Sequence, residues 1–172
     1  MSELTVRPLA PADATACDAI ILSLPYHSGN AGGRAECARA VREDAGLVAT
    51  RDRRVVGFLT VERHYERSAE ISWLAVEHAD RGQGVGSALV AALCETLRAE
   101  GRELQLVMTL SDSFDESAVE DSYVRTRAFY RGLGFIVARE FANLWPGNPV
   151  LLFVKALLLQ SQLTWQREGP LQ

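Results

Sequence analysis

The chain has 172 residues, of which 48% are hydrophobic and 23% charged, a composition typical of one soluble globular domain. This apolar content excludes an intrinsically disordered protein, and no membrane span is expected because the most apolar stretch, Val150 to Leu159, is short and carries Lys155. The formal net charge of −4 argues against nucleic acid as a partner, since duplex binding normally needs a basic face.

The first half of the chain predicts one strand, two helices and three more strands. Leu4 to Leu9 alternates apolar and polar residues as a strand does, and two helices follow over 12–24 and 35–44, separated by the glycine-rich loop 25–33. Three strands come next in quick succession, at Leu47 to Arg51, Val55 to Arg63 and Ala69 to Val76. Their short connections are typical of antiparallel hairpins.

The second half alternates helices with strands. Leu89, Leu93 and Leu97 follow Val85 at four-residue spacing, which predicts an amphipathic helix that ends at Gly101. The remaining elements are a strand at Glu103 to Leu110, an acidic loop at 111–121, a helix at Ser122 to Leu133, and strands at Phe135 to Phe141 and Val150 to Leu157 around a turn at 143–149.

The resulting order, β-α-α-β-β-β-α-β-α-β-β, predicts an α/β protein with a mixed sheet and helices on both faces. We expect a single domain over residues 1–157, followed by a tail, 158–172, that mixes apolar and polar residues.

The three cysteines, Cys17, Cys37 and Cys94, are odd in number and lie far apart. Without a CxxC pair they predict neither a metal site nor a disulfide framework, and small buried thiols in a reducing compartment fit the pattern. The N-terminal segment carries charges and no continuous apolar core, unlike a secretory signal. We therefore expect a cytoplasmic protein.

The most informative stretch is RGQGVG, Arg81 to Gly86, between the strand ending at Val76 and the helix. Its glycines let backbone N–H groups turn toward a ligand, and the helix start adds a positive dipole end, so the segment predicts an anion site suited to phosphate. A P-loop would need a lysine after Gly86, and a dinucleotide fingerprint would need glycine at position 87 or 89. A glycine-rich turn with no ligand is the remaining alternative.

Two motifs resemble those of one family. RGQGVG is similar to the Q/R-x-x-G-x-G/A signature of the Gcn5-related N-acetyltransferases (GNAT), and AFYRGLGF, Ala128 to Phe135, is similar to the end of that family's last helix. The element order over residues 3 to 157 agrees with the family as well. The resemblance implies a GNAT-like acyl-CoA N-acyltransferase fold with acetyl-CoA as donor.

By this resemblance the coenzyme pyrophosphate binds the N–H groups of Gly82 to Ser87. The pantetheine arm pairs with the strand backbone at Leu74 to Val76, where that strand splays from the strand ending at Leu110. One departure is Tyr123, at a position where the family often has an asparagine. The expected coenzyme-binding residues are Leu74, Ala75, Val76, Arg81, Gly82, Gln83, Gly84, Val85, Gly86, Ser87, Phe129 and Tyr130.

Amine acetylation needs a proton for the departing thiolate, a polarised carbonyl and a neutral amine. Tyr130 is the candidate acid, because a phenol is protonated at neutral pH, although it could instead be a packing residue. The backbone N–H of Val76 is the candidate carbonyl polariser. Glu70, which resembles the base of histone-type members, is the candidate base; the alternative is an exposed strand-end glutamate with ordered water taking the proton.

Strict alternation places Glu70 on the same face as Leu74 and Val76. The histidines are expected in loops or on the surface. A non-catalytic CoA-binding regulatory module is the alternative to an enzyme.

The acceptor is expected to be a small-molecule or peptide amine, and Asp112, Asp115 and Glu116 favour a cationic one. The apolar run Pro149 to Leu159 favours a homodimer.

Overall fold

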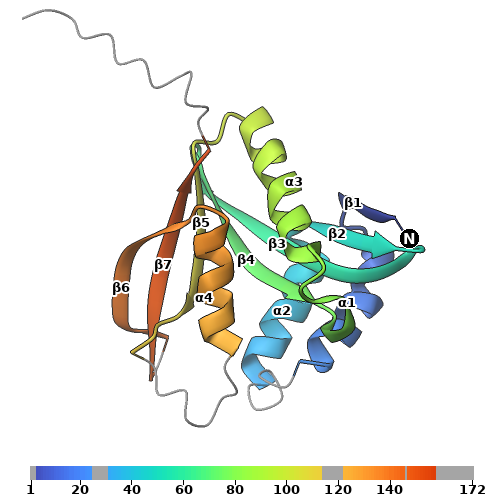
Figure 1. Ribbon diagram of the computed structural model, residues 1–172, viewed down its shortest axis with the longest axis horizontal. Helices are drawn as coiled ribbons and strands as arrows, with labels where there is room; N and C mark the ends of the chain where they lie inside the picture. Colours follow the sequence, from blue (N-terminus) through green and yellow to red (C-terminus); the bar gives the residue numbers. More distant parts are fainter. Residues whose placement is uncertain (1–2, 25–30, 114–121, 146, 158–172) are drawn as a thin grey trace, which may run out of the picture.

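The computed structural model describes residues 3–24, 31–113, 122–145 and 147–157. Figure 1 shows the elements in chain order: β1 (Leu4–Pro8), η1 (Pro11–Asp13), α1 (Ala14–Leu22), α2 (Ala31–Glu43), β2 (Ala45–Arg51), β3 (Arg54–Tyr65), β4 (Ser68–Val76), η3 (His78–Asp80), α3 (Val85–Ala99), β5 (Leu104–Leu110), α4 (Ser122–Gly132), β6 (Ile136–Trp145) and β7 (Asn148–Ala156). This order confirms the predicted α/β class, with two short 3-10 turns added.

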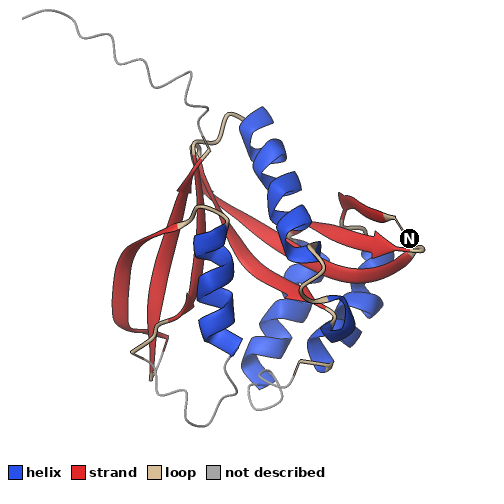
Figure 2. Cartoon of the chain, in the orientation of Figure 1, coloured by secondary structure: helices blue, strands red, loops and turns tan. Residues whose placement is uncertain are grey.

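One seven-stranded sheet runs in the order β1-β2-β3-β4-β5-β7-β6. Only β4 and β5 are parallel, and every other neighbouring pair is antiparallel. The parallel pair follows from the sequence, because α3 carries the chain from the end of β4 back to the start of β5. Figure 2 shows the helices set against this curved sheet.

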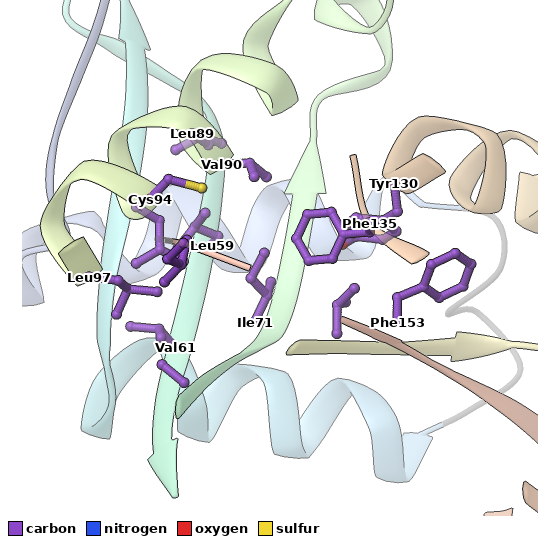
Figure 3. Close-up of a cluster of buried hydrophobic side chains, with 14 of the residues drawn as sticks. Leu59, Val61, Ile71, Leu89, Val90, Cys94, Leu97, Tyr130, Phe135 and Phe153 are labelled. Carbon is purple, nitrogen blue, oxygen red and sulfur yellow. The ribbon is translucent and has the colours of Figure 1, made fainter. Parts of the chain in front are cut away.

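The two faces of the sheet carry separate cores. We call the face covered by α3 and α4 the α3 face; side chains such as Leu89, Leu97, Tyr130 and Phe153 are buried there (Figure 3). The opposite face, which we call the α1 face, is covered by α1 and α2, with Phe58 and other apolar side chains beneath them.

Glycines end both helices of the α3 face as predicted. After α3, Gly101 has φ +76° and the N–H of Arg102 donates to the carbonyl of Leu97 at 2.8 Å. After α4, Gly134 has φ +84° and the N–H of Phe135 donates to the carbonyl of Tyr130 at 3.1 Å. Both are Schellman caps, in which only glycine adopts the left-handed conformation without strain.

The end of the chain differs from the prediction in one respect. The expected turn at 143–149 is shorter, because β6 continues to Trp145 and β7 begins at Asn148. The strand β7 lies between β5 and β6, so it is not an edge strand, and its Val150, Leu151 and Phe153 side chains are buried within the subunit. The edge strand β6 instead exposes apolar side chains, and Ile136 is 70% exposed. The second half of the predicted dimer segment, from Leu158 on, lies outside the described residues.

All three cysteines are free and buried, as the sequence predicts. Burial raises the pKa of Cys17 and of Cys37 to about 12, so both thiols stay protonated and unreactive at neutral pH. Within the described ranges, no helix is long and apolar enough to cross a membrane, and no three His, Cys, Asp or Glu side chains are grouped as metal ligands would be.

Candidate coenzyme-binding site

The sheet opens between its two parallel strands. Pairing of β4 with β5 is confined to Ser68–Ile71 against Leu104–Val107. Beyond that point β4 continues to Val76 paired only with β3, and β5 continues to Leu110 paired only with β7. The strands therefore separate toward their carboxyl ends, which confirms the splay that the resemblance implies.

A β-bulge lies where the opening begins. Thr60 pairs with Trp73 and Val61 pairs with Ile71, so Ser72 is an extra residue on β4. Its hydroxyl lies 2.8 Å from the hydroxyl of the buried Thr60. A bulge bends its strand and increases the local twist. We infer that the bulge turns β4 away from β5.

In the second half of β4, successive backbone N–H groups point alternately toward β3 and toward the gap between β4 and β5. The N–H of Glu77 donates to the carbonyl of Val56 at 2.9 Å, which fixes the phase of the antiparallel ladder. Ala75 and Trp73 are then the residues that bond to β3, whereas the N–H groups of Leu74 and Val76 face the gap. Of the three residues expected to bind pantetheine, Leu74 and Val76 present backbone groups there, and Ala75 belongs to the β3 ladder.

The loop RGQGVG lies at the carboxyl end of β4 and leads into α3. Gly82 has φ +72°, and Gly84, the residue before the helix, has φ +81°. A Cβ at either position would meet no atom within 4 Å, so the glycines are required by the left-handed backbone and leave open space above the loop. The first-turn N–H groups of Val85, Gly86 and Ser87 have no helical carbonyl to bond. This arrangement suits an anion, as predicted.

The side chains of Arg81 and Gln83 form hydrogen bonds with the backbone that precedes the loop. The Nε of Arg81 donates to the carbonyl of Val76 at 3.2 Å, and the amide of Gln83 donates to the carbonyl of Ala79 at 2.7 Å. The same amide group accepts a hydrogen bond from Nη1 of Arg51 at 2.6 Å. Gln83 thus uses its side chain to fix the loop, which leaves its backbone for a ligand.

A buried carboxylate that sequence analysis missed ties this loop to the β2–β3 hairpin. Asp80 is 4% exposed and accepts from Arg51 at 2.7 Å and from Arg54 at 3.1 Å. Arg54 also bonds Glu77. The only sequence signal was an acidic residue just before the glycines, and the arginines that pair with it are about 30 positions away.

Gly86 lets α3 and α4 meet beside the gap. A Cβ on Gly86 would lie 3.1 Å from Cζ of Phe129 and 3.9 Å from a methyl group of Leu74. The third glycine of the motif is therefore closely packed, and a Cβ there would require the Phe129 ring to shift by a few tenths of an ångström. It also brings Phe129, a predicted coenzyme-binding residue, against the loop and β4.

Tyr130 lies one residue further along α4, inside an aromatic cluster. Its ring centroid is 5.1 Å from that of Phe129, 5.4 Å from Phe135 and 6.2 Å from Phe153. Burial raises the pKa of its phenol well above the ordinary value, so the group is protonated at every physiological pH. The side chain is only 4% exposed, so these ring contacts account for its packing.

The face predicted for Glu70 is wrong. Ala69 and Ile71 are buried on the α3 face, and after the bulge Leu74 and Val76 are partly buried there, whereas Trp73 packs on the α1 face. Since Ser72 is an extra residue, alternation restarts there, and Glu70 lies on the α1 face with its direct partner Glu62.

The acidic loop is described only in part. Ser111 is buried at the end of β5, Asp112 is exposed, and residues 114–121 lie outside the described ranges, including the candidate substrate residues Asp115 and Glu116. Ser111 donates to Glu140 of β6 at 2.5 Å, and hydrogen bonds from Ser111 and Ser113 lower the pKa of that carboxyl. A second carboxylate therefore lies near Asp112.

A mixed sheet that opens between parallel strands, next to a glycine-rich helix start, is the arrangement of the GNAT-like acyl-CoA N-acyltransferase fold. Comparison with solved structures supports this fold. A GNAT-family protein from Desulfovibrio desulfuricans superposes with a TM-score of 0.77 at 19% identity, covering 91% of this chain and all of its own. The ribosomal-protein-S18-alanine N-acetyltransferase from Escherichia coli gives 0.71 at 17% identity, covering 91% of this chain and 96% of its own.

An aminoglycoside 6'-N-acetyltransferase complexed with coenzyme A is also similar, with a TM-score of 0.71 and 18% identity over 91% of this chain and 98% of its own. A search of curated proteins found no match. The GNAT acetyltransferase domain itself matches residues 42–137, more than half of the chain. The protein belongs to the GNAT acetyltransferase family.

Proposed function

We propose that this protein is a cytoplasmic N-acetyltransferase that moves the acetyl group of acetyl-CoA directly to a primary amine. The proposal rests on two groups of backbone N–H groups, those of Leu74 and Val76 that face the gap and those of the first turn of α3. Together they match a ligand with a polar arm and a diphosphate, because the arm can extend the sheet while the helix start holds the anion.

In this proposal the amine nitrogen attacks the thioester carbonyl and the C–S bond breaks. The leaving group is the thiolate of coenzyme A. The N–H of Val76 donates to the carbonyl oxygen as negative charge develops on it. The Tyr130 hydroxyl donates its proton to the departing sulfur, and the phenolate then regains a proton from water. The same burial that raises the pKa of the phenol also desolvates the thiolate, which increases the proton affinity of the sulfur.

Glu70 takes the proton that the amine loses. Its side chain is mostly buried, with 16% exposed, and it lies two residues before Ser72, the extra residue of the bulge. Glu70 lies on the face of the sheet opposite α3. This arrangement fits donor and acceptor entering from opposite faces, which permits direct transfer.

The proposed acceptor carries net positive charge, as a polyamine, a basic amino acid or a lysine side chain does. The support is the acidic loop that follows β5, whose described residue Asp112 lies near Glu140. Carboxylates at this rim would raise the local concentration of a cation. Acceptors named for the similar structures, aminoglycosides and a ribosomal protein, belong to those proteins.

The direct test is to incubate the protein with acetyl-CoA and a panel of cationic and neutral amines and to follow thiol release. Amine-dependent release supports the enzyme. Tight binding of coenzyme A without release across the panel would identify a non-catalytic regulatory module instead, and absence of coenzyme binding would refute both.

A further inference from the structure

A histidine lies between two carboxylates on the α1 face, next to the candidate base. Nε2 of His64 is 2.8 Å from Oε2 of Glu70, and Nδ1 of His64 is 3.9 Å from Oε2 of Glu62. The sequence offered no partner for this histidine. The hairpin pairing of β3 with β4 supplies both, because Glu62 stands opposite Glu70 in the register and His64 follows two residues later.

The imidazole connects Glu70 to a solvent cavity. A cavity of about 370 Å³ lies at the start of β2, lined by Arg39, Asp44, Ala45, Val61, Glu62, Arg63 and His64. Glu70 does not line it. His64 is thus the residue that both contacts Glu70 and faces the cavity, with 39% of its side chain exposed.

The other charges around the cavity are engaged elsewhere. Arg39 of α2 pairs with Glu36, Glu43 and, at 3.8 Å, Asp44. Arg63 is bonded to Glu100 at 2.6 Å. Among the described residues, the carboxylates that form an ion-pair contact with the imidazole are those of Glu62 and Glu70.

We propose that His64 is a positioning and proton-relay residue that clears the proton from Glu70 into this cavity. The inference rests on the proposed function, in which Glu70 is the base. The N–H bond of the attacking amine breaks and its proton passes to the Glu70 carboxylate. Glu70 passes it to Nε2 of a neutral imidazole that carries hydrogen on Nδ1. The imidazolium then releases the Nδ1 proton to water in the cavity beside Glu62, and exchange with water restores the tautomer.

The chemical reason for the relay is the difference in basicity between the two groups. In water an imidazole holds a proton more tightly than a carboxylate, with reference pKa values of about 6.5 and 4.3. A glutamate alone is therefore a weak base for an amine proton near neutral pH. Coupled to an imidazole, the pair acts as one base better matched to that pH.

The test compares His64→Gln, Glu70→Gln and the double variant, using an acceptor found by the thiol-release screen. The glutamine amide can still bond Glu70, so a purely structural histidine would tolerate the change. We expect His64→Gln to lower kcat by about 10- to 100-fold with little change in KM, less than a full general base contributes because Glu70 remains. The double variant should be no slower than Glu70→Gln alone, because the two residues act as a unit.

Two further readouts separate a relay from a merely structural contact. Added imidazole should restore kcat of His64→Ala in proportion to its concentration and leave the wild type unchanged. The fall of kcat toward acid pH should move to lower pH in His64→Gln. His78→Gln, an exposed histidine of η3 whose described contact is through its carbonyl, is the matched control.

A wild-type rate in His64→Gln, or additive losses in the double variant, would overturn the relay while the acetyltransferase stands. If the wild type itself acetylates no amine, the proposed function fails, and the relay fails with it.

Discussion

The two halves of β4 differ in the strands with which they pair. From Ser68 to Ile71 the strand is paired on both edges, and its buried side chains complete the core of the α3 face. From Ser72 to Val76 it is paired only with β3, and its other edge offers backbone N–H groups to the gap. The extra residue Ser72 thus lies at the point where β4 changes from pairing on both edges to pairing on one edge.

The bulge also divides chemistry between the two faces of the sheet. After it, Leu74 and Val76 lie on the α3 face, with the glycine loop and Tyr130, where the coenzyme is proposed to bind. Before it, Glu70 lies on the α1 face with His64, where the amine is proposed to lose its proton. Donor and acceptor chemistry are thus assigned to opposite faces of one strand.

The largest effect is expected at Gly84, in the loop that follows the second half of β4. Gly84→Asp should weaken acetyl-CoA binding by about 100-fold or more, because a like charge facing the phosphates costs several kcal/mol. Calorimetric titration measures the affinity. Gly101→Asp is the matched control, since Gly101 has a similar φ of +76° and equally open surroundings at the other end of α3. Equal affinity in Gly84→Asp and the wild type would remove the anion site.

Tyr130→Phe tests whether the aromatic cluster contributes more than packing. The ring and its contacts with Phe129, Phe135 and Phe153 remain, and only the hydroxyl is lost. We expect kcat to fall by about 10- to 10⁴-fold with little change in coenzyme affinity. Tyr65→Phe, at a tyrosine that is 79% exposed, is the control. An unchanged kcat would assign Tyr130 to packing alone.

The bulge itself can be probed through the bond between Thr60 and Ser72. Thr60→Val should lower the free energy of unfolding by about 1–3 kcal/mol, because it removes a buried hydrogen bond and leaves the Ser72 hydroxyl without that partner. Adding Ser72→Ala should recover part of the loss, as chemical denaturation would show. Additive losses in the double variant would mean that the bond does not stabilise the bulge.

A smaller effect is expected at the rim. Neutralising Asp112, Asp115 and Glu116 to Asn or Gln should raise KM for a cationic acceptor a few-fold, and added salt should reduce the difference. Steady-state kinetics with matched cationic and neutral amines provides the measurement. Unchanged relative efficiency between the two amines would make the loop a solvated surface.

The smallest expectation concerns association. The sequence favoured a homodimer because Pro149 to Leu159 is apolar. In the structure β7 is an interior strand, and the homodimer prediction now depends on the exposed apolar side chains of the edge strand β6. A weak dimer is expected in light scattering at micromolar concentration. A mass of 18.9 kDa, that of one chain, would contradict it.

Local patterns determined most of the fold. Four-residue spacing of apolar side chains located α3, and glycines at 101 and 134 located the helix ends, because capping depends on neighbours in sequence. The glycine loop was found for the same reason. Its conformation is set by backbone freedom at Gly82 and Gly84, which the sequence displays directly.

Only the tertiary structure decided the features that depend on how strands meet. The extra residue at Ser72 is defined by the register between β3 and β4, so alternation within β4 placed Glu70 on the wrong face. Hairpins also bring together side chains that are distant in the sequence. Examples are the bonds of Asp80 to Arg51 and Arg54 and the bond of His64 to Glu70. A pattern along one strand cannot contain them, because register and pairing depend on two strands at once.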